Sequence, residues 1–235
     1  MRRQAAALVL IAVSALVIGC TATVSGRPVP ADNSGPRILH PVSVSALDAL
    51  LLETEQINST LNAGGMKVWF SASDMWDWSS GVNDNNCLAV DGPAQDRVYA
   101  GTGWTAMRGQ RLDDSDDGSR KRNHYAIQAV VAYPSAGQAK ALYDSSVRNW
   151  AACANRRFSD APQGQTETVW TVADTHQVSG TLSTSEVQEG GGGWSCQRAL
   201  TVRNNVAIDT VTCAYFLAGG SAVDIAQQIA AKVPQ

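Results

Sequence analysis

Five cysteines carry the clearest chemistry in this chain of 235 residues. The first, Cys20, follows Val17, Ile18 and Gly19, and this order of aliphatic, small and cysteine residues is that of a lipobox. At a lipobox the chain is cut before the cysteine, which then carries lipid. The alternative, an ordinary signal peptide followed by an incidental cysteine, would leave an unpaired thiol in a secreted protein. The sequence therefore predicts lipidation of Cys20.

The other four cysteines predict two disulfides, because an even number in an exported chain is typical of a disulfide framework. Three pairings are formally open. Cys196 and Cys213 lie on adjacent strand-like runs joined by an Asn-Asn turn, which favours a bridge between them and leaves Cys87 for Cys153. Zinc is the alternative, but none of the four stands in a CxxC pair and no histidine lies near them in sequence. We expect no metal and no cofactor.

Catalytic motifs are absent from the sequence. It contains no GxSxG, HExxH or P-loop, and no GxGxxG at a strand-to-helix turn. The three histidines are His40, His124 and His176, and a triad of one of them with a serine stays open because triad members need not be close in sequence. Surface histidines are the favoured interpretation, so no catalytic residue is assigned and no enzyme is expected.

Two clusters of Asp and Asn could bind calcium. The spacing Asp113-x-Ser115-x-Asp117-Gly118 copies the opening of an EF-hand loop, but His124 stands where the bidentate Glu should be. The group 83–86 is similarly short of carboxylates. Both are interpreted as solvated turns.

A candidate ligand site lies on a predicted hairpin. Two β-type runs, 97–112 and 123–133, flank the turn at 113–118. The odd positions of the second run are mostly apolar and should face the core, while the even positions should face a cleft or solvent. A symmetric turn would place Gln110 near His124, and Arg108 near Ala126.

Five side chains should then project from the even face: Trp104, Arg108, Gln110, His124 and Gln128. Arginine forms paired hydrogen bonds with carboxylate or phosphate and tryptophan stacks, so this face could hold a polar or anionic ligand. A solvated sheet face, or a buried network around Trp104, is the alternative.

The segments before the domain are predicted to be a targeting segment and a linker. Residues 1–19 combine a basic start, Arg2 and Arg3, with an apolar stretch shorter than the roughly 20 residues of a spanning helix, which predicts a signal peptide. Residues 20–42 are rich in Thr, Ser, Gly and Pro and should form a flexible tether. We therefore expect a protein fixed by lipid to the cell membrane on its extracytoplasmic face.

Residues 43–235 should form one domain of the α+β class, a central antiparallel β-sheet packed by helices. Helices are expected over 45–61, over 135–158 against the odd face, and from Ser221 to 233; further strands are expected at 66–70, 169–172, 177–182, 194–202 and 206–216. Loss of Arg2 and Arg3 with the leader takes the formal net charge from −3 to −5. A nucleic-acid partner is therefore not expected, since it needs a clustered positive surface.

Four segments together resemble the PknH-like extracellular sensor domain family: Cys87–Pro93, Val98–Gln110, Gln128–Ala136 and Trp150-x-x-Cys153. The family occurs in mycobacteria as the outer half of a receptor serine/threonine kinase and as free-standing lipoproteins, and the lipobox places this chain with the latter. The resemblance runs from about Val44 to the C-terminus. It implies a central antiparallel sheet, an open groove for an unidentified ligand, and disulfides joining the first cysteine to the second and the third to the fourth. It supplies no catalytic residues.

The sequence thus favours a membrane-anchored envelope lipoprotein with a non-catalytic ligand-binding or sensor domain. Its expected partners are the membrane, through the N-terminal lipid, and an unknown small ligand or envelope component; the oligomeric state stays open. One alternative is a protein–protein interaction module that docks through the loop carrying Trp76 and Trp78. The other is an envelope hydrolase of no established class.

Overall fold

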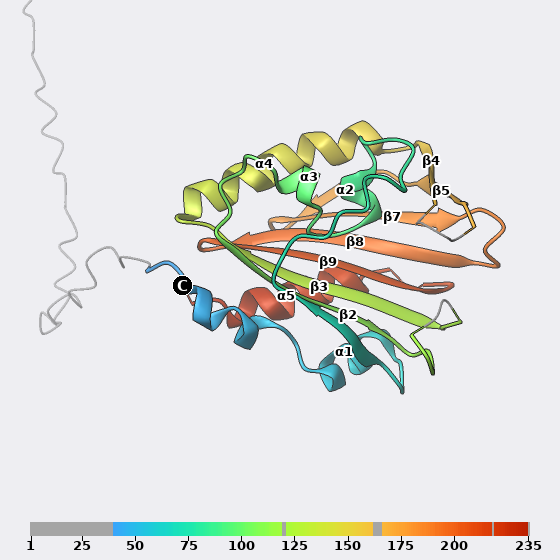
Figure 1. Cartoon of the computed structure of the whole chain (residues 1–235), viewed down its shortest axis with the longest axis horizontal. Coiled ribbons are helices and arrows are strands. Elements are labelled where there is room, and N and C mark those ends of the chain that lie inside the picture. The colour runs from blue at the N-terminus through green and yellow to red at the C-terminus, as the bar shows by residue number, and fades with distance from the viewer. Residues whose placement is uncertain (1–39, 119–120, 162–165, 218, 235) are drawn as a thin grey trace, which may run out of the picture. The chain divides into compact units, whose positions relative to one another are not determined.

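A computed structural model describes residues 40–118, 121–161, 166–217 and 219–234 (Figure 1). The predicted signal peptide, Cys20 and most of the tether lie outside the described residues. Within the described part, no helix is long and apolar enough to cross a membrane.

An antiparallel sheet, nine strands in the described residues, forms the centre of the domain (Figure 1). Its order is β1-β2-β3-β9-β8-β7-β5-β4, and β6 pairs with β7 outside this path. The strands are β1 Lys67–Ala72, β2 Ala106–Asp113, β3 His124–Ala132, β4 Arg157–Asp160, β5 Thr168–Val172, β6 His176–Val178, β7 Thr181–Gln188, β8 Trp194–Arg203 and β9 Val206–Tyr215. The predicted α+β class with a central antiparallel sheet is confirmed.

Each face of the sheet packs against helices. Helix α4 (Ala136–Cys153) and the short helices α2 (Leu88–Asp91) and α3 (Asp96–Tyr99) lie over one face, called here the α4 face (Figure 1). Helix α5 (Ser221–Lys232), helix α1 (Thr54–Leu61) and two 3-10 turns, η1 (Val44–Ala46) and η2 (Asp48–Leu50), cover the opposite α5 face. Both faces of the central strands are therefore apolar, because each must bury against its own helices.

Strand β3 shows the two cores most clearly. Its odd positions Ile127 and Val131 pack into the core of the α4 face, whereas Ala126 and Val130 pack into the core of the α5 face. All four are at most 1% exposed. The predicted assignment of odd positions to the helix from residue 135 is correct, but Ala126 and Val130 at even positions face a second core, where a cleft or solvent was predicted.

The two disulfides are those predicted. Cys87–Cys153 ties the segment before α2 to the last residue of α4, and Cys196–Cys213 joins directly paired residues of β8 and β9. All four cysteines are buried. Each bridge therefore fixes elements that surround the α4 face.

Helix α4 begins as predicted, where Ser135 Oγ accepts a hydrogen bond from the backbone N–H of Gln138. It ends at Cys153, five residues before the predicted end at 158. Residues 157–160 form strand β4 and pair with β5, which buries Phe158. Tertiary pairing thus overrides the helical pattern at this end.

The N-terminal helix predicted over 45–61 is broken. Its middle is extended because Leu52 N–H donates to Gln128 Oε1 at 2.8 Å, and Leu52 O accepts from Gln128 Nε2 at 2.9 Å. Helix α1 then starts with a capping box formed by Glu53 and Gln56. Ser45 makes no cap: only 3-10 turns precede the break.

Glycines divide two of the runs expected to be continuous strands. In the run 97–112, Gly101 and Gly103 adopt φ values of +73° and +80°, so that α3 ends before them and β2 begins only at Ala106. In the run 177–182, Gly180 (φ +76°) lies in the turn between β6 and β7. The predicted strand at 97–105 is therefore wrong.

Val42, expected in the tether, is docked on the domain. Its N–H donates to Asn205 Oδ1 at 2.7 Å, and Asn205 Nδ2 donates to the carbonyls of Val42 at 3.2 Å and Tyr133 at 2.7 Å. Asn205 is 1% exposed, so all of its amide bonds are made inside the fold. The ordered domain therefore includes Val42.

Candidate functional site

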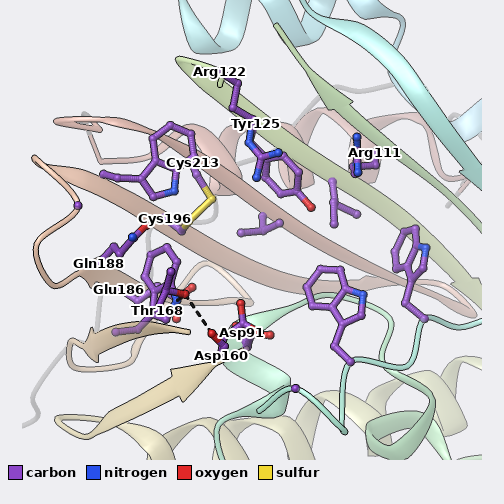
Figure 2. Close-up of a pocket in the computed structure, with 18 of the residues that line it drawn as sticks. Asp91, Arg111, Arg122, Tyr125, Asp160, Thr168, Glu186, Gln188, Cys196 and Cys213 are labelled. Carbon is purple, nitrogen blue, oxygen red and sulfur yellow. Dashed lines mark hydrogen bonds between the residues drawn. A yellow bond between two sulfur atoms is a disulfide. The ribbon is translucent and has the colours of Figure 1, made fainter. Parts of the chain in front are cut away.

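A cavity of about 1290 Å³ opens on the α4 face, and none of its lining residues belongs to α4 (Figure 2). Strands β2, β3, β8 and β9 form its floor, and β1, the loop after β1, α2, β4, β5 and β7 contribute its sides. Helix α4 covers only part of this sheet face. The uncovered part is the candidate functional site.

Aromatic side chains dominate the walls of the cavity. Five of the seven tryptophans of the chain line it: Trp69, Trp76, Trp78, Trp170 and Trp194. Phe70, Tyr125 and Tyr215 line it as well. The tryptophans come from β1, the loop after β1, β5 and β8. Tryptophans present a large apolar surface and a polar N–H, and they are typical of sites that bind ligands.

Two glycines give the loop tryptophans their room. An added Cβ at Gly92 would lie 2.1 Å from Cζ3 of Trp78, and one at Gly109 would lie 2.7 Å from Cη2 of Trp76. The loop is also anchored, since Trp78 N–H donates to Gln95 Oε1 at 2.8 Å and Trp76 N–H donates to the Ala94 carbonyl at 3.0 Å. The two rings are therefore held in place by close backbone approach.

Three carboxyl groups meet on one side of the cavity: Asp91 of α2, Asp160 of β4 and Glu186 of β7 (Figure 2). Glu186 is 2% exposed, and its Oε2 has no hydrogen-bond partner among the residues that the structure describes. Burial first, and then the charge of Asp91, raise the pKa of Glu186 well above its ordinary value; Asp160 adds to this and Arg198 opposes it. Glu186 therefore keeps its proton to a higher pH than an ordinary glutamate.

A buried ion pair supports this acidic side. Arg198 Nη2 donates to Asp209 Oδ1 at 2.8 Å and to the Ala89 carbonyl at 3.1 Å. Asp209 Oδ2 accepts from Ala94 N–H at 2.9 Å and from the Tyr99 hydroxyl at 3.0 Å. These bonds fix the segment from α2 to α3, which carries Asp91, onto β8 and β9.

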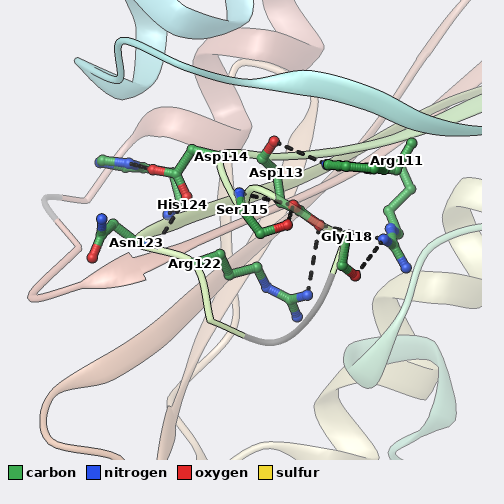
Figure 3. A network of polar contacts seen from close by, with 9 residues as sticks. Arg111, Asp113, Asp114, Ser115, Gly118, Arg122, Asn123 and His124 are labelled. Carbon is green, nitrogen blue, oxygen red and sulfur yellow. Dashed lines mark hydrogen bonds and ion pairs between the residues drawn. The ribbon is translucent and has the colours of Figure 1, made fainter.

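A second network shapes the loop between β2 and β3 (Figure 3). Asp113, completely buried, accepts hydrogen bonds from Ser115 and faces Arg111 Nη2 at 3.4 Å and Arg122 Nη1 at 3.7 Å. Arg111 Nη2 also donates to the Gly118 carbonyl at 3.2 Å. Arg111, Arg122 and Gly118 all line the cavity.

The prediction of solvated turns is therefore wrong for Asp113 and Ser115, because both are buried. Arginines of the hairpin compensate the charge of the buried Asp113 carboxylate. At the other cluster, Asn83 Oδ1 accepts from Ser159 N–H at 2.8 Å, and Asp84 pairs with Arg156 at 2.5 Å. Among the described residues, no group of three His, Cys, Asp or Glu side chains could hold a metal ion.

The predicted register of the hairpin is wrong by four residues. Gln110 pairs with Gln128 and Arg108 with Val130, where the symmetric turn at 113–118 implied His124 and Ala126. The pairing of β2 with β3 continues in this register to Asp113 and Tyr125, so the loop that connects the two strands is longer than the turn signal indicated. An even shift leaves each residue of the paired strands β2 and β3 on its predicted side of the sheet, whereas Trp104 precedes β2 and packs on the opposite α4 face.

The structure does not bring the five predicted ligand residues together, and none of them lines the large cavity. Gln128 is fully buried, and its Oε1 accepts the hydrogen bond from Leu52 N–H. Its Nε2 donates to Gln110 Oε1 at 3.0 Å. Arg108 and Gln110 line a small pocket of about 220 Å³ with Asp48, which pairs with Arg108 at 3.1 Å. Helix α5 and the N-terminal segment cover the sheet face on which these residues lie.

The remaining two residues lie apart. Trp104 precedes β2 and packs against the core of the α4 face, and His124 Nδ1 lies 2.7 Å from Asp114 Oδ2. This His-Asp pair resembles two members of a triad, but in the described part of the chain no serine hydroxyl is hydrogen-bonded to His124. The hydrolase interpretation gains no support from this pair.

The comparisons with known proteins agree with this architecture. Residues 42–232 match the family described as PknH-like extracellular domain. Serine/threonine-protein kinase PknH of Mycobacterium bovis and of Mycobacterium tuberculosis are each 34% identical over 230 residues, which is 97% of this chain. The chain spans only about a third of these relatives, 36% and 34% of their lengths. The crystal structure of the extracellular domain of PknH from Mycobacterium tuberculosis superposes with a TM-score of 0.77 at 33% identity, covering 82% of this chain and 97% of that one.

Proposed function

This chain belongs to the PknH-like extracellular domain family, and we propose that it is a membrane-anchored envelope lipoprotein whose non-catalytic domain binds a small ligand in the tryptophan-walled cavity. Three parts of this proposal have separate support. The family match supports an extracytoplasmic sensor domain, the lipobox at Cys20 supports the anchor, and the cavity supports the ligand.

The gathering of five tryptophans around one cavity is the observation that carries the ligand proposal. Trp69 and Trp194 are separated by more than half of the chain, and the sheet brings them to one site. Ring surface of this kind stabilises a fold most when it is buried among other side chains. Rings that line an open cavity forgo part of that burial, and a ligand that fills the cavity would restore it.

Native mass spectrometry tests the ligand proposal. The domain, purified from a mycobacterial host under mild conditions, should carry an additional mass that dissociates on activation. Trp78→Ala removes one wall of the cavity and should lower the occupancy several-fold. Trp104→Ala is the matched control, since it removes the same side chain at a position outside the cavity.

Two results would count against ligand binding in the cavity. One is equal occupancy in Trp78→Ala and the wild type, which would place the ligand elsewhere. The other is a wild-type domain that carries no added mass and shows no saturable binding in a fragment screen. Circular dichroism of each variant should show that the fold is kept.

A further inference from the structure

We propose that the acidic side of the cavity receives a cationic nitrogen, so that the ligand is a protonated organic amine with an apolar body. This inference rests on the proposed function and deepens it by naming the chemical class of the ligand. It is carried by the geometry around Glu186, by the charges of the lining and by the aromatic walls.

Glu186 supplies the first argument. Its side chain lines the cavity and is 2% exposed, and no other residue in the described part of the chain forms a hydrogen bond with its Oε2. A buried polar atom without a partner costs free energy, and natural proteins keep few of them. A ligand that donates a hydrogen bond to Oε2 removes this cost, and an ammonium group is such a donor.

The lining charges supply the second argument. Among the described residues, five carboxyl groups line the cavity (Asp77, Asp91, Asp117, Asp160 and Glu186), against the two arginines Arg111 and Arg122. Both arginines face the buried Asp113, which does not line the cavity, at 3.4 Å and 3.7 Å. Asp113 thus offsets part of their positive charge, and among the described residues the carboxyl groups of the lining outnumber its arginines.

The aromatic walls supply the third argument. The Arg122 guanidinium lies 4.3 Å from the ring centroid of Tyr125 and 5.9 Å from that of Trp194. Rings of this cavity therefore already accept a cation through cation–π contacts, which are strongest on tryptophan and are the usual means of recognising quaternary ammonium groups. With a volume of about 1290 Å³, the cavity has room for an apolar body beside the cationic nitrogen.

Three probes of one shape separate the contribution of charge. 2-Phenylethylamine is cationic at pH 7, 2-phenylethanol is its neutral analogue, and 3-phenylpropionate is its anionic analogue. Titration of each into the isotopically labelled domain, followed through the tryptophan indole N–H signals, reports both affinity and place. The amine should bind at least about ten-fold more tightly than the alcohol, and the anion should bind most weakly.

Two variants locate the effect. Glu186→Gln should reduce the preference for amine over alcohol to about three-fold or less, while the alcohol binds as before. Glu55→Gln is the matched control, because Glu55 is an exposed carboxyl on α1, on the opposite face of the sheet. Asp160→Asn gives a second reading from the same acidic side and should also reduce the preference.

Proton release gives an independent measure of the same contact. Burial and the negative charges of Asp91 and Asp160 raise the pKa of the Glu186 carboxyl, which Arg198 opposes, so that this carboxyl holds its proton to a higher pH than an ordinary glutamate. An ammonium bound beside it should drive that proton off. Calorimetric titrations of the amine at several pH values above 4.5, each in two buffers of different ionisation enthalpy, should therefore differ between the buffers by a heat that disappears in Glu186→Gln.

The outcomes are distinguishable. If the alcohol binds at the cavity as tightly as the amine, or the anion binds most tightly, the inference of a cationic ligand is overturned while the cavity remains a binding site. A preference for the amine that is unchanged in Glu186→Gln and in Asp160→Asn also overturns it. If no probe shifts any cavity tryptophan signal, the inference and the proposed function both fail.

Discussion

Arg198 donates a hydrogen bond to Asp209 at 2.8 Å in the interior of the protein, where the two residues are 1% and 4% exposed. The same guanidinium also donates to the carbonyls of Ala89 and Thr210, and it lies 5.1 Å from the ring centroid of Trp150. The pair thus connects β8, β9, α2 and α4. It fixes the position of the acidic side of the cavity relative to the sheet.

Removing either member of the Arg198–Asp209 pair should lower the stability of the fold strongly, because the charge of the other member stays buried without its partner. We expect Arg198→Met to lower the free energy of unfolding by about 3–5 kcal/mol. Replacing both partners, in Arg198→Met with Asp209→Leu, should cost clearly less than the sum of the single changes. Denaturant unfolding followed by circular dichroism measures all three. Additive losses would show that the two charges do not depend on each other.

The disulfides should contribute unequally to stability. Cys87–Cys153 closes a loop of 66 residues and Cys196–Cys213 one of 17. Restriction of the unfolded chain predicts about 4 and 3 kcal/mol for these loops. The double Ala variant of each pair, compared by denaturant unfolding, checks both magnitude and order. A larger loss for the short loop would show that native packing around Cys196 and Cys213 matters more than chain entropy.

Gln110 and Gln128 show which features of the fold the sequence could predict and which it could not. Strand alternation correctly placed both on one face, but the interpretation left this face to a ligand. The signal that was missed is the number of amphipathic helices: the apolar stripe of α5, with Ile225 and Ile229, needs a sheet face of its own. A polar residue on a strand between two helical layers is then more often a buried hydrogen-bonding residue than a ligand contact.

The cavity could not have been assembled from the sequence. The loop with Trp76 and Trp78 stood out for its composition, but Trp170 and Glu186 lie in other strands and meet it only through the order β1-β2-β3-β9-β8-β7-β5. Local patterns give strand identity and facing, whereas this order depends on long-range pairing. The disulfides were predictable because each pairing followed from cysteine count and one local hairpin.

The anchor makes a prediction that does not depend on the cavity. If lipid is attached at Cys20, Cys20→Ala should leave the protein as an uncleaved precursor or release it from the membrane fraction. Detergent phase partitioning with mass analysis of the mature N-terminus measures this. A mutant protein that is still processed and still partitions into detergent would contradict lipidation at this residue.

Close packing of the loop tryptophans gives a prediction about the shape of the cavity. Gly92→Ala places a Cβ against the six-membered ring of Trp78, which must move. We expect a loss of about 1–3 kcal/mol in stability and several-fold weaker binding of the aromatic probes. Gly64→Ala is the control, because an added Cβ there meets nothing within 4 Å. Unchanged binding in Gly92→Ala would show that Trp78 does not contact the probes.

The raised pKa of Glu186 makes a prediction about stability and pH. Its ordinary value is 4.5, and burial together with Asp91 and Asp160 holds the value in the folded protein well above it. Between these two values the folded state binds a proton that the unfolded state has lost. The free energy of unfolding therefore falls as pH rises through this window and is unaffected by Glu186 below about pH 4.5.

Glu186→Gln has no proton to lose, so it should match the wild type near pH 4 and be more stable than the wild type at pH 7 to 8. Melting temperatures of both proteins across this range measure the difference, and Glu55→Gln should track the wild type throughout. A variant that is less stable than the wild type at pH 8 would show that the ionised Glu186 is compensated in the fold. A carboxyl group that lowers stability at neutral pH has to be explained by something other than folding, and a cationic ligand beside Oε2 would provide that explanation.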